Sequence, residues 1–448
     1  MLRKWLFPIL LAAAAVRGQG PVTLEWCVRT ALSRNPGLRA AETETRSARE
    51  DSRQAWASFL PTLDASGSFK RQSTVPSLEI PPIALPFNGG IPFSIFPPGG
   101  MQLGLRDSYD FRMTVSQPLF TGFRLIHRRK MANALEEGKR LEEAQKRNEL
   151  ILKVETAYGM ALKAGRILDI AKSGREQVAA HLSDAERFFE QGLVKKDELL
   201  RAKVRRTEAD LAVLQAENGV ALAAVALENA IGEKLAPGST FEWTPDAAVP
   251  DMDLAASLEK ARSGRPEVAA VRSARRAAEA GKGLARGGVF PSIAVFGSLG
   301  YGKPGLNFIG KKWMDYWVVG AGAEWNLWSW GKTRSQMHQA ELRSAGLSET
   351  QRQVEEGVVL EVTQACLRLD EAGERLGLTA EMEIQARESY RIAENLYAQG
   401  QSSHTEFFDA QSECTRARLA RAQAEIDLML ARANWRKAVG ESADAYQP

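Results

Sequence analysis

Four segments with two different faces limit what this chain can fold into. In Trp317–Leu327, apolar residues alternate with small or polar ones, which is the period-2 pattern of a strand. Its length suits a tilted strand that crosses a bilayer, and Trp at both ends of the apolar face suits the two interfaces. The same alternation predicts strands at about 62–70, 109–119, 291–302 and 315–328. The residues expected to face the membrane are Phe69, Phe111, Met113, Val115, Ile293, Val295, Trp317, Val319, Trp325 and Leu327.

These four strands are too few to seal a barrel in lipid. Any one of them would also fit a soluble β-sandwich, but together they favour a membrane barrel. Bacterial barrels made by a single chain start at about eight strands. An open sheet edge in lipid leaves N–H and C=O groups unpaired, which costs several kcal/mol for each group. Several chains must therefore share their strands, and the strand count alone does not choose between two chains and three.

The chain contains two copies of one unit of about 200 residues. A repeat of this length determines the whole architecture. Landmarks recur at an offset of 230 before the predicted helical hairpins, and at an offset of 208 at the turns and ends of the hairpins. The first copy therefore holds 22 extra residues, which we assign to a Pro/Gly-rich loop at 71–108. The matching pairs are Pro36 and Pro266, Pro61 and Pro291, Gly192 and Gly400, and Gly232 and Gly440.

Outside the strands the pattern is helical. Apolar residues spaced by three and four predict a helix from about 125 to 190, roughly 100 Å long, that packs against other helices at a shallow angle. Gly192 and Gly400 mark the turns of two helical hairpins. The predicted fold class is mainly α with a membrane β-barrel part. Long helical hairpins would form a periplasmic α-barrel, and the strands would contribute to a shared barrel.

The first residues have the order of a secretory signal. Two basic residues precede an apolar run, and small residues follow it. A cluster of prolines marks a linker between the copies. The expected divisions are a signal peptide at 1–20, repeat one at 21–234, a linker at 235–252, repeat two at 253–440 and an unstructured tail at 441–448.

The sequence offers no credible site for catalysis, a metal or a cofactor. Its four histidines lack metal-ligand spacing. A Gly-Lys-Thr sequence at 331–333 lacks the first glycine of a phosphate loop, because Asn326 occupies that position. The net charge of +4 is too small to indicate a nucleic-acid partner. We expect Cys27, Cys366 and Cys414 to be free thiols.

The order of these motifs resembles the TolC-like outer-membrane factors, the exit ducts of efflux pumps and type I secretion systems. The resemblance covers nearly the whole chain after residue 20, and its landmarks lie at 24–41, 116–124, 187–211, 263–272, 325–335 and 397–423. It implies a homotrimer with a twelve-stranded barrel. It also implies a periplasmic adaptor protein and an inner-membrane pump or ABC transporter as partners, with lipid of a Gram-negative-type outer membrane around the barrel.

The resemblance implies roles for two sets of residues at the hairpins. The turns would contact the adaptor, and carboxylates just past them would form a periplasmic gate that favours cations. Helix-capping glycines and ordinary solvated acids are the alternative interpretation. Ser402 stands where the family has a basic gate partner, so the resemblance does not extend to a salt-bridge latch. The gate residues would be Glu198, Glu406 and Asp409, and the docking residues Gly192, Leu193, Val194, Gly400, Gln401, Ser402 and Ser403.

We therefore expect a passive outer-membrane duct that is not an enzyme and uses no cofactor. The alternative is a periplasmic structural or scaffolding coiled-coil protein whose β-hairpins are soluble. The sequence does not distinguish between a drug, a metal and a protein as the exported substrate.

Overall fold

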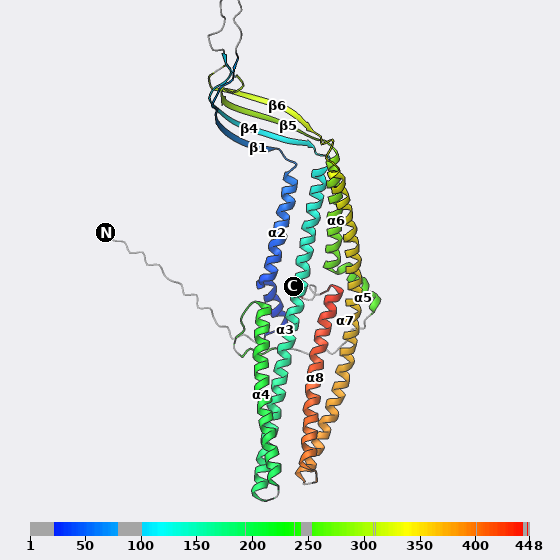
Figure 1. Ribbon diagram of the computed structural model, residues 1–448. Helices are drawn as coiled ribbons and strands as arrows, with labels where there is room; N and C mark the ends of the chain where they lie inside the picture. Colours follow the sequence, from blue (N-terminus) through cyan, green and yellow to red (C-terminus); the bar gives the residue numbers. More distant parts are fainter. Residues whose placement is uncertain are drawn as a thin grey trace, which may run out of the picture. The chain divides into compact units, whose positions relative to one another are not determined.

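The computed structural model describes residues 22–78, 101–192, 194–236, 238–242, 253–307, 309, 311–399, 401–441 and 446. It divides into two compact units (Figure 1). The helical unit comprises Met1–Thr45, Lys139–Val271 and Thr350–Pro448, and the sheet unit comprises Arg46–Gly138 and Arg272–Glu349.

The helices of the two predicted copies match in length. Corresponding helices have the same length in both copies: 11 residues in α1 and α5, 67 in α3 and α7, and 36 in α4 and α8. Pro36 and Pro266 open α2 and α6, where a missing N–H costs nothing. The bounds are α1 Leu24–Arg34, α2 Pro36–Ala57, α3 Arg124–Glu190, α4 Lys196–Ile231, α5 Leu254–Gly264, α6 Pro266–Arg286, α7 Lys332–Ala398 and α8 His404–Val439.

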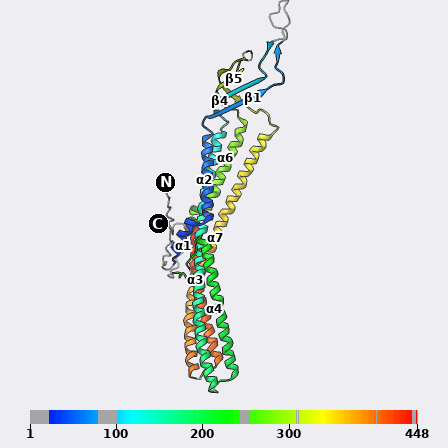
Figure 2. The same cartoon turned by 90° about the vertical axis from the view of Figure 1, so that its left-hand side faces the viewer.

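Within the helical unit, α3 with α4 and α7 with α8 form two antiparallel hairpins (Figures 1 and 2). The hairpins contact each other through α3 and α8, because Gly159 leaves room for Leu430 and Glu155 pairs with Arg436. A hypothetical Cβ on Gly159 would lie 3.0 Å from Leu430 Cδ2. This leaves α4 and α7 as the outer helices of the set in Figure 1.

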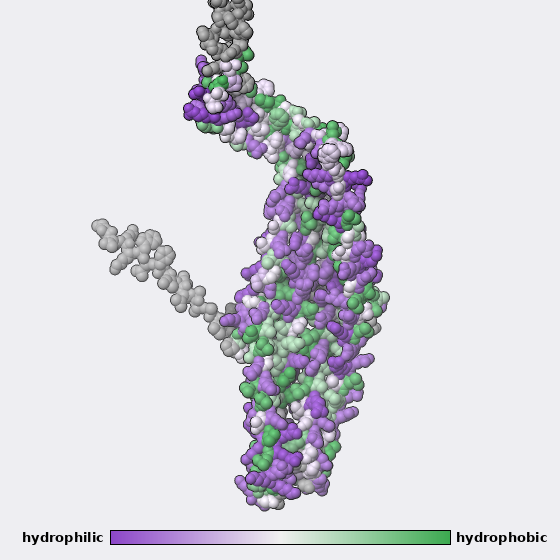
Figure 3. All heavy atoms as spheres, viewed as in Figure 1, coloured by the Kyte–Doolittle hydropathy of each residue, from purple (hydrophilic) through white to green (hydrophobic). Residues whose placement is uncertain are grey.

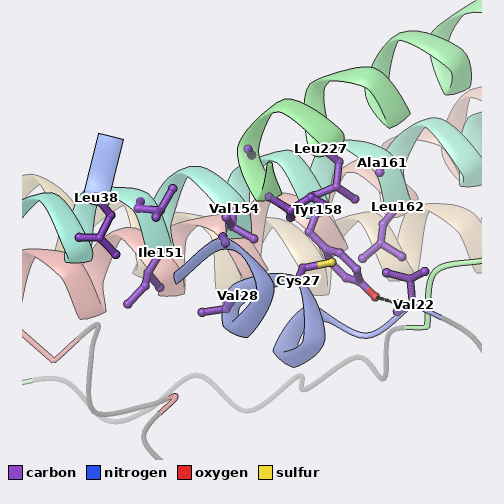
Figure 4. Close-up of a cluster of buried hydrophobic side chains, with 14 of the residues drawn as sticks. Val22, Cys27, Val28, Leu38, Ile151, Val154, Tyr158, Ala161, Leu162 and Leu227 are labelled. Carbon is purple, nitrogen blue, oxygen red and sulfur yellow. Dashed lines mark hydrogen bonds between the residues drawn. The ribbon is translucent and has the colours of Figure 1, made fainter. Parts of the chain in front are cut away.

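The largest core of the helical unit surrounds Tyr158 of α3 (Figure 4). The predicted apolar stripe of α3 supplies Ile151, Val154, Tyr158 and Ala161, all buried. Cys27 and Val28 of α1 pack against this stripe. The hydroxyl group of Tyr158 donates to the backbone oxygens of Val22, at 2.8 Å, and Glu242, at 2.5 Å.

Two described residues of the linker and the tail contact distant parts of the chain. Val22 forms a parallel bridge with Phe241, which lies in the predicted linker. Tyr446, in the tail expected to be unstructured, donates a hydrogen bond of 2.7 Å to the buried Glu155. Both interactions join segments far apart in the chain, so local sequence patterns do not reveal them. The three cysteines are free thiols.

The sheet unit contains the four expected strands in the order β1-β4-β5-β6, each antiparallel to its neighbour. The pairing of β4 with β5 joins the two copies. A separate pair, β2 and β3, lies inside the predicted 71–108 loop, whose residues 79–100 are outside the described residues. The bounds are β1 Thr62–Arg71, β2 Ser77–Leu78, β3 Met101–Gln102, β4 Asp107–Phe120, β5 Ser292–Lys303 and β6 Met314–Glu324.

The predicted end of the last strand is wrong. We expected it to run to about 328, but β6 ends at Glu324, so Trp325 and Leu327 are not strand residues. Glu324 pairs with Ser292, the first residue of β5. Pro291 precedes it and has no N–H to donate, so β6 has no partner beyond this point.

Candidate functional site

The strand register places the predicted apolar residues on one face of the sheet. Directly paired residues of an antiparallel sheet project from the same face, and one such row runs through Ala65, Met113, Leu299 and Trp317. Trp317 and Val319 are 71% and 73% exposed, which is unusual for large apolar side chains. Figure 3 shows apolar side chains at the surface of the sheet beside polar ones. The strand residues that share this face are Phe69, Phe111, Met113, Val115, Ile293, Val295, Trp317 and Val319.

Aromatic side chains lie at both ends of the sheet. At the end away from the helices, Trp313 stacks on Tyr301 with ring centres 5.0 Å apart and also contacts Tyr109. At the helix end, Phe123 contacts Phe120 and Phe290, with ring centres 5.3 and 6.2 Å apart. Trp325, although beyond β6, is exposed here and donates its indole N–H to the Val289 oxygen at 3.0 Å. Two aromatic bands around an apolar zone are typical of a membrane barrel.

The hairpin turns occur where the sequence predicts them. Gly192 has a φ of +72°, which glycine adopts without the strain of a side chain, and its N–H donates to the Phe189 oxygen at 3.0 Å. Of the other predicted docking residues, Val194, Gln401, Ser402 and Ser403 lie in or beside the turns. Leu193 and Gly400 lie outside the described residues.

Glu406 is part of a helix cap, which our sequence analysis did not identify. Ser403 is the N-cap of α8, and its hydroxyl accepts from the Glu406 N–H at 3.3 Å. In return, the Glu406 carboxylate accepts from the Ser403 N–H at 3.0 Å and the Ser402 hydroxyl at 2.8 Å. These donors, with the Ser403 N–H first, lower the pKa of the Glu406 carboxyl. The Ser-x-x-Glu pattern of a capping box is visible in the sequence.

The other two predicted gate carboxylates have different surroundings. Asp409, one turn further along α8, is exposed and lines a groove of about 470 Å³ between α4 and α8. Phe408 also lines this groove, and the guanidinium carbon of Arg205 lies 5.9 Å from its ring centre. Glu198 is half-buried in the first turn of α4, near Tyr397, whose pKa is raised by burial and by Glu198.

A buried aromatic cluster connects three helices close to the turns. His181 of α3 is 5% exposed, and its ring centre lies 4.8 Å from those of Phe407 and Phe408 in α8. Tyr397 of α7 lies 5.1 Å from the same ring. Phe407 and Phe408 come between Glu406 and Asp409, so this cluster fixes the helix that carries both carboxylates. Its residues come from three distant segments, so the sequence alone gives no signal of it.

The outer helix α4 has an exposed apolar stripe. By length and composition α4 is the one helix among the described residues that would suffice to cross a membrane, which we did not expect from the sequence. Its buried residues, such as Val213 and Leu227, lie on one side. On the opposite side, spaced by three, four, seven or eight, lie residues that are each more than half exposed: Leu200, Val204, Leu211, Leu214, Leu222 and Val225. Such a stripe is typical of helix packing.

Comparison with solved structures shows how this fold is used elsewhere. The structure of CusC, a protein that forms a transmembrane channel, has a TM-score of 0.77 and 17% identity, and covers 93% of this chain and 92% of that one. VceC from Vibrio cholerae has a TM-score of 0.75 and 16% identity, with coverage of 94% and 99%. The open-state MtrE channel of Neisseria gonorrhoeae has a TM-score of 0.75 and 20% identity, with coverage of 94% and 89%.

The family model for outer membrane efflux proteins matches residues 27–233 and 257–441. The two matched segments correspond to the two copies, and the gap between them contains the predicted linker. Comparison with curated protein sequences gives no match. The chain thus belongs to the outer membrane efflux protein family, and it shares the fold of these solved outer-membrane proteins.

Proposed function

We propose that three copies of the chain form one passive duct that serves a tripartite efflux pump or a type I secretion system. The observation that carries this proposal is the sheet with two unpaired edges. Among the described residues β1 pairs only with β4, and β6 only with β5. In lipid such edges must be paired, so β1 of one copy would pair with β6 of the next. Three copies of a four-stranded sheet would give a closed twelve-stranded barrel.

The helical unit supports the same arrangement. α7, the other outer helix, carries exposed apolar residues at positions that share one side, including Leu360, Leu367 and Leu378. The α4 stripe of one copy would pack on the α7 stripe of the next. A head-to-tail contact of this kind closes a ring when the rotation between copies fits. The sheet edges and the outer helices thus both support the same cyclic association.

The exposed apolar face of the sheet would be the outside of this barrel, in contact with lipid. Charged and hydroxyl residues such as Asp64, Arg112 and Ser298 lie on the opposite face and would line the lumen. Trp325 and Leu327, which follow β6, would lie at the periplasmic interface of the membrane instead of within its apolar zone.

The hairpin turns would dock a periplasmic adaptor, and the acids beside them would form the duct entrance. Asp409 is the strongest gate residue, because it is exposed and lines the α4/α8 groove. Glu406 would add charge but is also bonded into the cap of α8. Glu198 is half-buried and would contribute less. Energy would come from the inner-membrane pump, since the duct itself is passive.

Two measurements test this proposal. The detergent-solubilised particle should contain three chains by light scattering, and it should conduct ions in a planar bilayer. A stable monomer with an intact sheet would contradict the shared barrel. A three-chain particle without conductance would contradict the duct.

Adaptor docking needs its own test. A photo-crosslinking residue at Val194 or Gln401 should capture one periplasmic adaptor in intact cells, whereas the same residue at Glu217, midway along α4, should not. Equal capture at both places would argue against docking at the turns. The family match supports the duct over the alternative of a periplasmic scaffolding protein.

A further inference from the structure

A hydrogen-bonded cluster of charged and polar side chains lies on the face of the sheet opposite the apolar face. Asp110 and Arg112 belong to β4, and Tyr316 belongs to β6. Arg112 Nη2 lies 3.0 Å from Asp110 Oδ2 and 3.2 Å from the Tyr316 hydroxyl oxygen. The Tyr316 hydroxyl group also donates to Asp110. Each side chain contacts the other two.

This cluster depends on two glycines of β5. Gly300 pairs with Arg112 and with Tyr316, and Gly302 pairs with Asp110. A hypothetical Cβ on Gly300 would lie 2.2 Å from Tyr316 Cζ, so the phenol ring lies directly on the backbone of β5. Tyr316 therefore reaches β4 across a whole strand, which any side chain at position 300 would prevent. Neither glycine position is needed for a turn.

The cluster lies near the loop end of the sheet. It lines a cavity of about 1080 Å³ together with residues of the β3–β4 connection, such as Leu105, and of the β5–β6 connection, such as Asn307. The side chains of Arg112 and Asp110 are 46% and 34% exposed, so solutes in this cavity reach both charges. The helices leave the opposite end of the strands, towards the periplasm, so the cluster lies towards the extracellular end.

We propose that Asp110 and Arg112 form a charge-balanced ring at the extracellular end of the lumen, which lets solutes of either charge sign leave the duct. This inference rests on the proposed three-copy barrel, which places three copies of the cluster around one opening. Arg112 would contact anionic groups such as carboxylates, and Asp110 would contact cationic groups such as ammonium ions. Because Asp110 and Arg112 supply one charge of each sign in every copy, this pair by itself repels neither class.

The ion selectivity of single channels in a salt gradient tests this ring. Arg112→Gln leaves three uncompensated carboxylates and should raise the potassium-to-chloride permeability ratio by at least about twofold. Asp110→Asn leaves three guanidinium groups and should lower the ratio by a similar factor. The double variant restores neutrality and should return the ratio to that of the unaltered protein.

The chain contains a matched control on the other face of the same sheet. Arg71 of β1 pairs with Asp107 of β4 at 3.5 Å, and both lie on the apolar face. Arg71→Gln should leave the permeability ratio unchanged. The inference is overturned if channels form but the two single variants do not shift the ratio, or shift it in the same direction. If the unaltered protein forms no channels, the proposed duct itself is wrong.

Discussion

At the scale of single residues, the carboxylate of Glu406 combines structure with charge. We propose it as a gate residue, and it also completes the cap of α8. Glu406→Ala would remove the charge and the cap together, so its effect could not be attributed to either one. Glu406→Gln separates the charge from the cap, because glutamine at this position accepts the same hydrogen bonds without a charge.

We predict that Glu406→Gln changes ion selectivity and preserves the cap, whereas Ser403→Ala does the opposite. Loss of the Ser403 hydroxyl should cost about 1 kcal/mol of local helix stability and speed amide hydrogen exchange in the first turn of α8. Conductance in a bilayer reports the charge, and hydrogen exchange reports the cap. Unchanged cation preference in Glu406→Gln, with the cap intact, would remove Glu406 as a gate residue.

The cap should also depend on pH. The pKa of Glu406 is lowered in the folded protein, first by the Ser403 N–H and then by the Ser402 hydroxyl. Its contribution is therefore present above the ordinary glutamate pKa and is lost as the pH falls through the lowered value. Amide exchange in the first turn of α8 should speed up over that acidic range. The same measurement on Glu406→Gln should show no such transition, and a transition of equal size there would assign it to another group.

The cysteines give a test of the core around Tyr158. Burial raises the pKa of the Cys27 thiol to about 12, so almost no reactive thiolate exists at neutral pH. We predict that a maleimide reagent modifies Cys27 only after unfolding, and that half-buried Cys414 reacts earlier. Peptide mass spectrometry after timed labelling distinguishes the two. Rapid labelling of Cys27 in the folded protein would contradict the packing of α1 on α3.

At the scale of elements, the spacing of apolar residues was enough to predict a helix or strand that keeps the same surroundings along its length. The alternation in Trp317–Leu327 located a strand, and the stripe through Tyr158 located the buried side of α3. The same spacing did not predict features that depend on a partner far away in the chain. β6 stops because β5 starts at Ser292, and Val22 is ordered because Phe241 lies beside it. The buried aromatic cluster around His181 could not be predicted from the sequence for the same reason.

The two faces of β6 offer a prediction at this scale. Val319→Arg would place a charge on the apolar face and should cost about 2–4 kcal/mol if that face meets the middle of the bilayer. Val318→Arg, at the neighbouring position on the polar face, should cost much less. Heat stability of the particle in gels, compared for the two variants, checks this. Equal losses would argue against a lipid-facing surface at Val319.

At the scale of the whole molecule, association should depend on the outer helices. Leu222 is 72% exposed in the single chain yet apolar, and it lies on the α4 stripe. We predict that Leu222→Asp lowers the temperature at which the particle separates into single chains, whereas Glu217→Ala, off the stripe, does not. Native mass spectrometry during heating measures this directly. An undiminished three-chain particle would exclude the α4 stripe as the contact between copies.

The core in Figure 4 also has a consequence for biosynthesis. It combines Val28 of α1 with Ile426 of α8, so its first and last contributors are separated by most of the chain. A ribosome must therefore finish nearly the entire polypeptide before this interior can close. Until then this core stays incomplete, and α1 and α3 lack the contact with α8 that completes it.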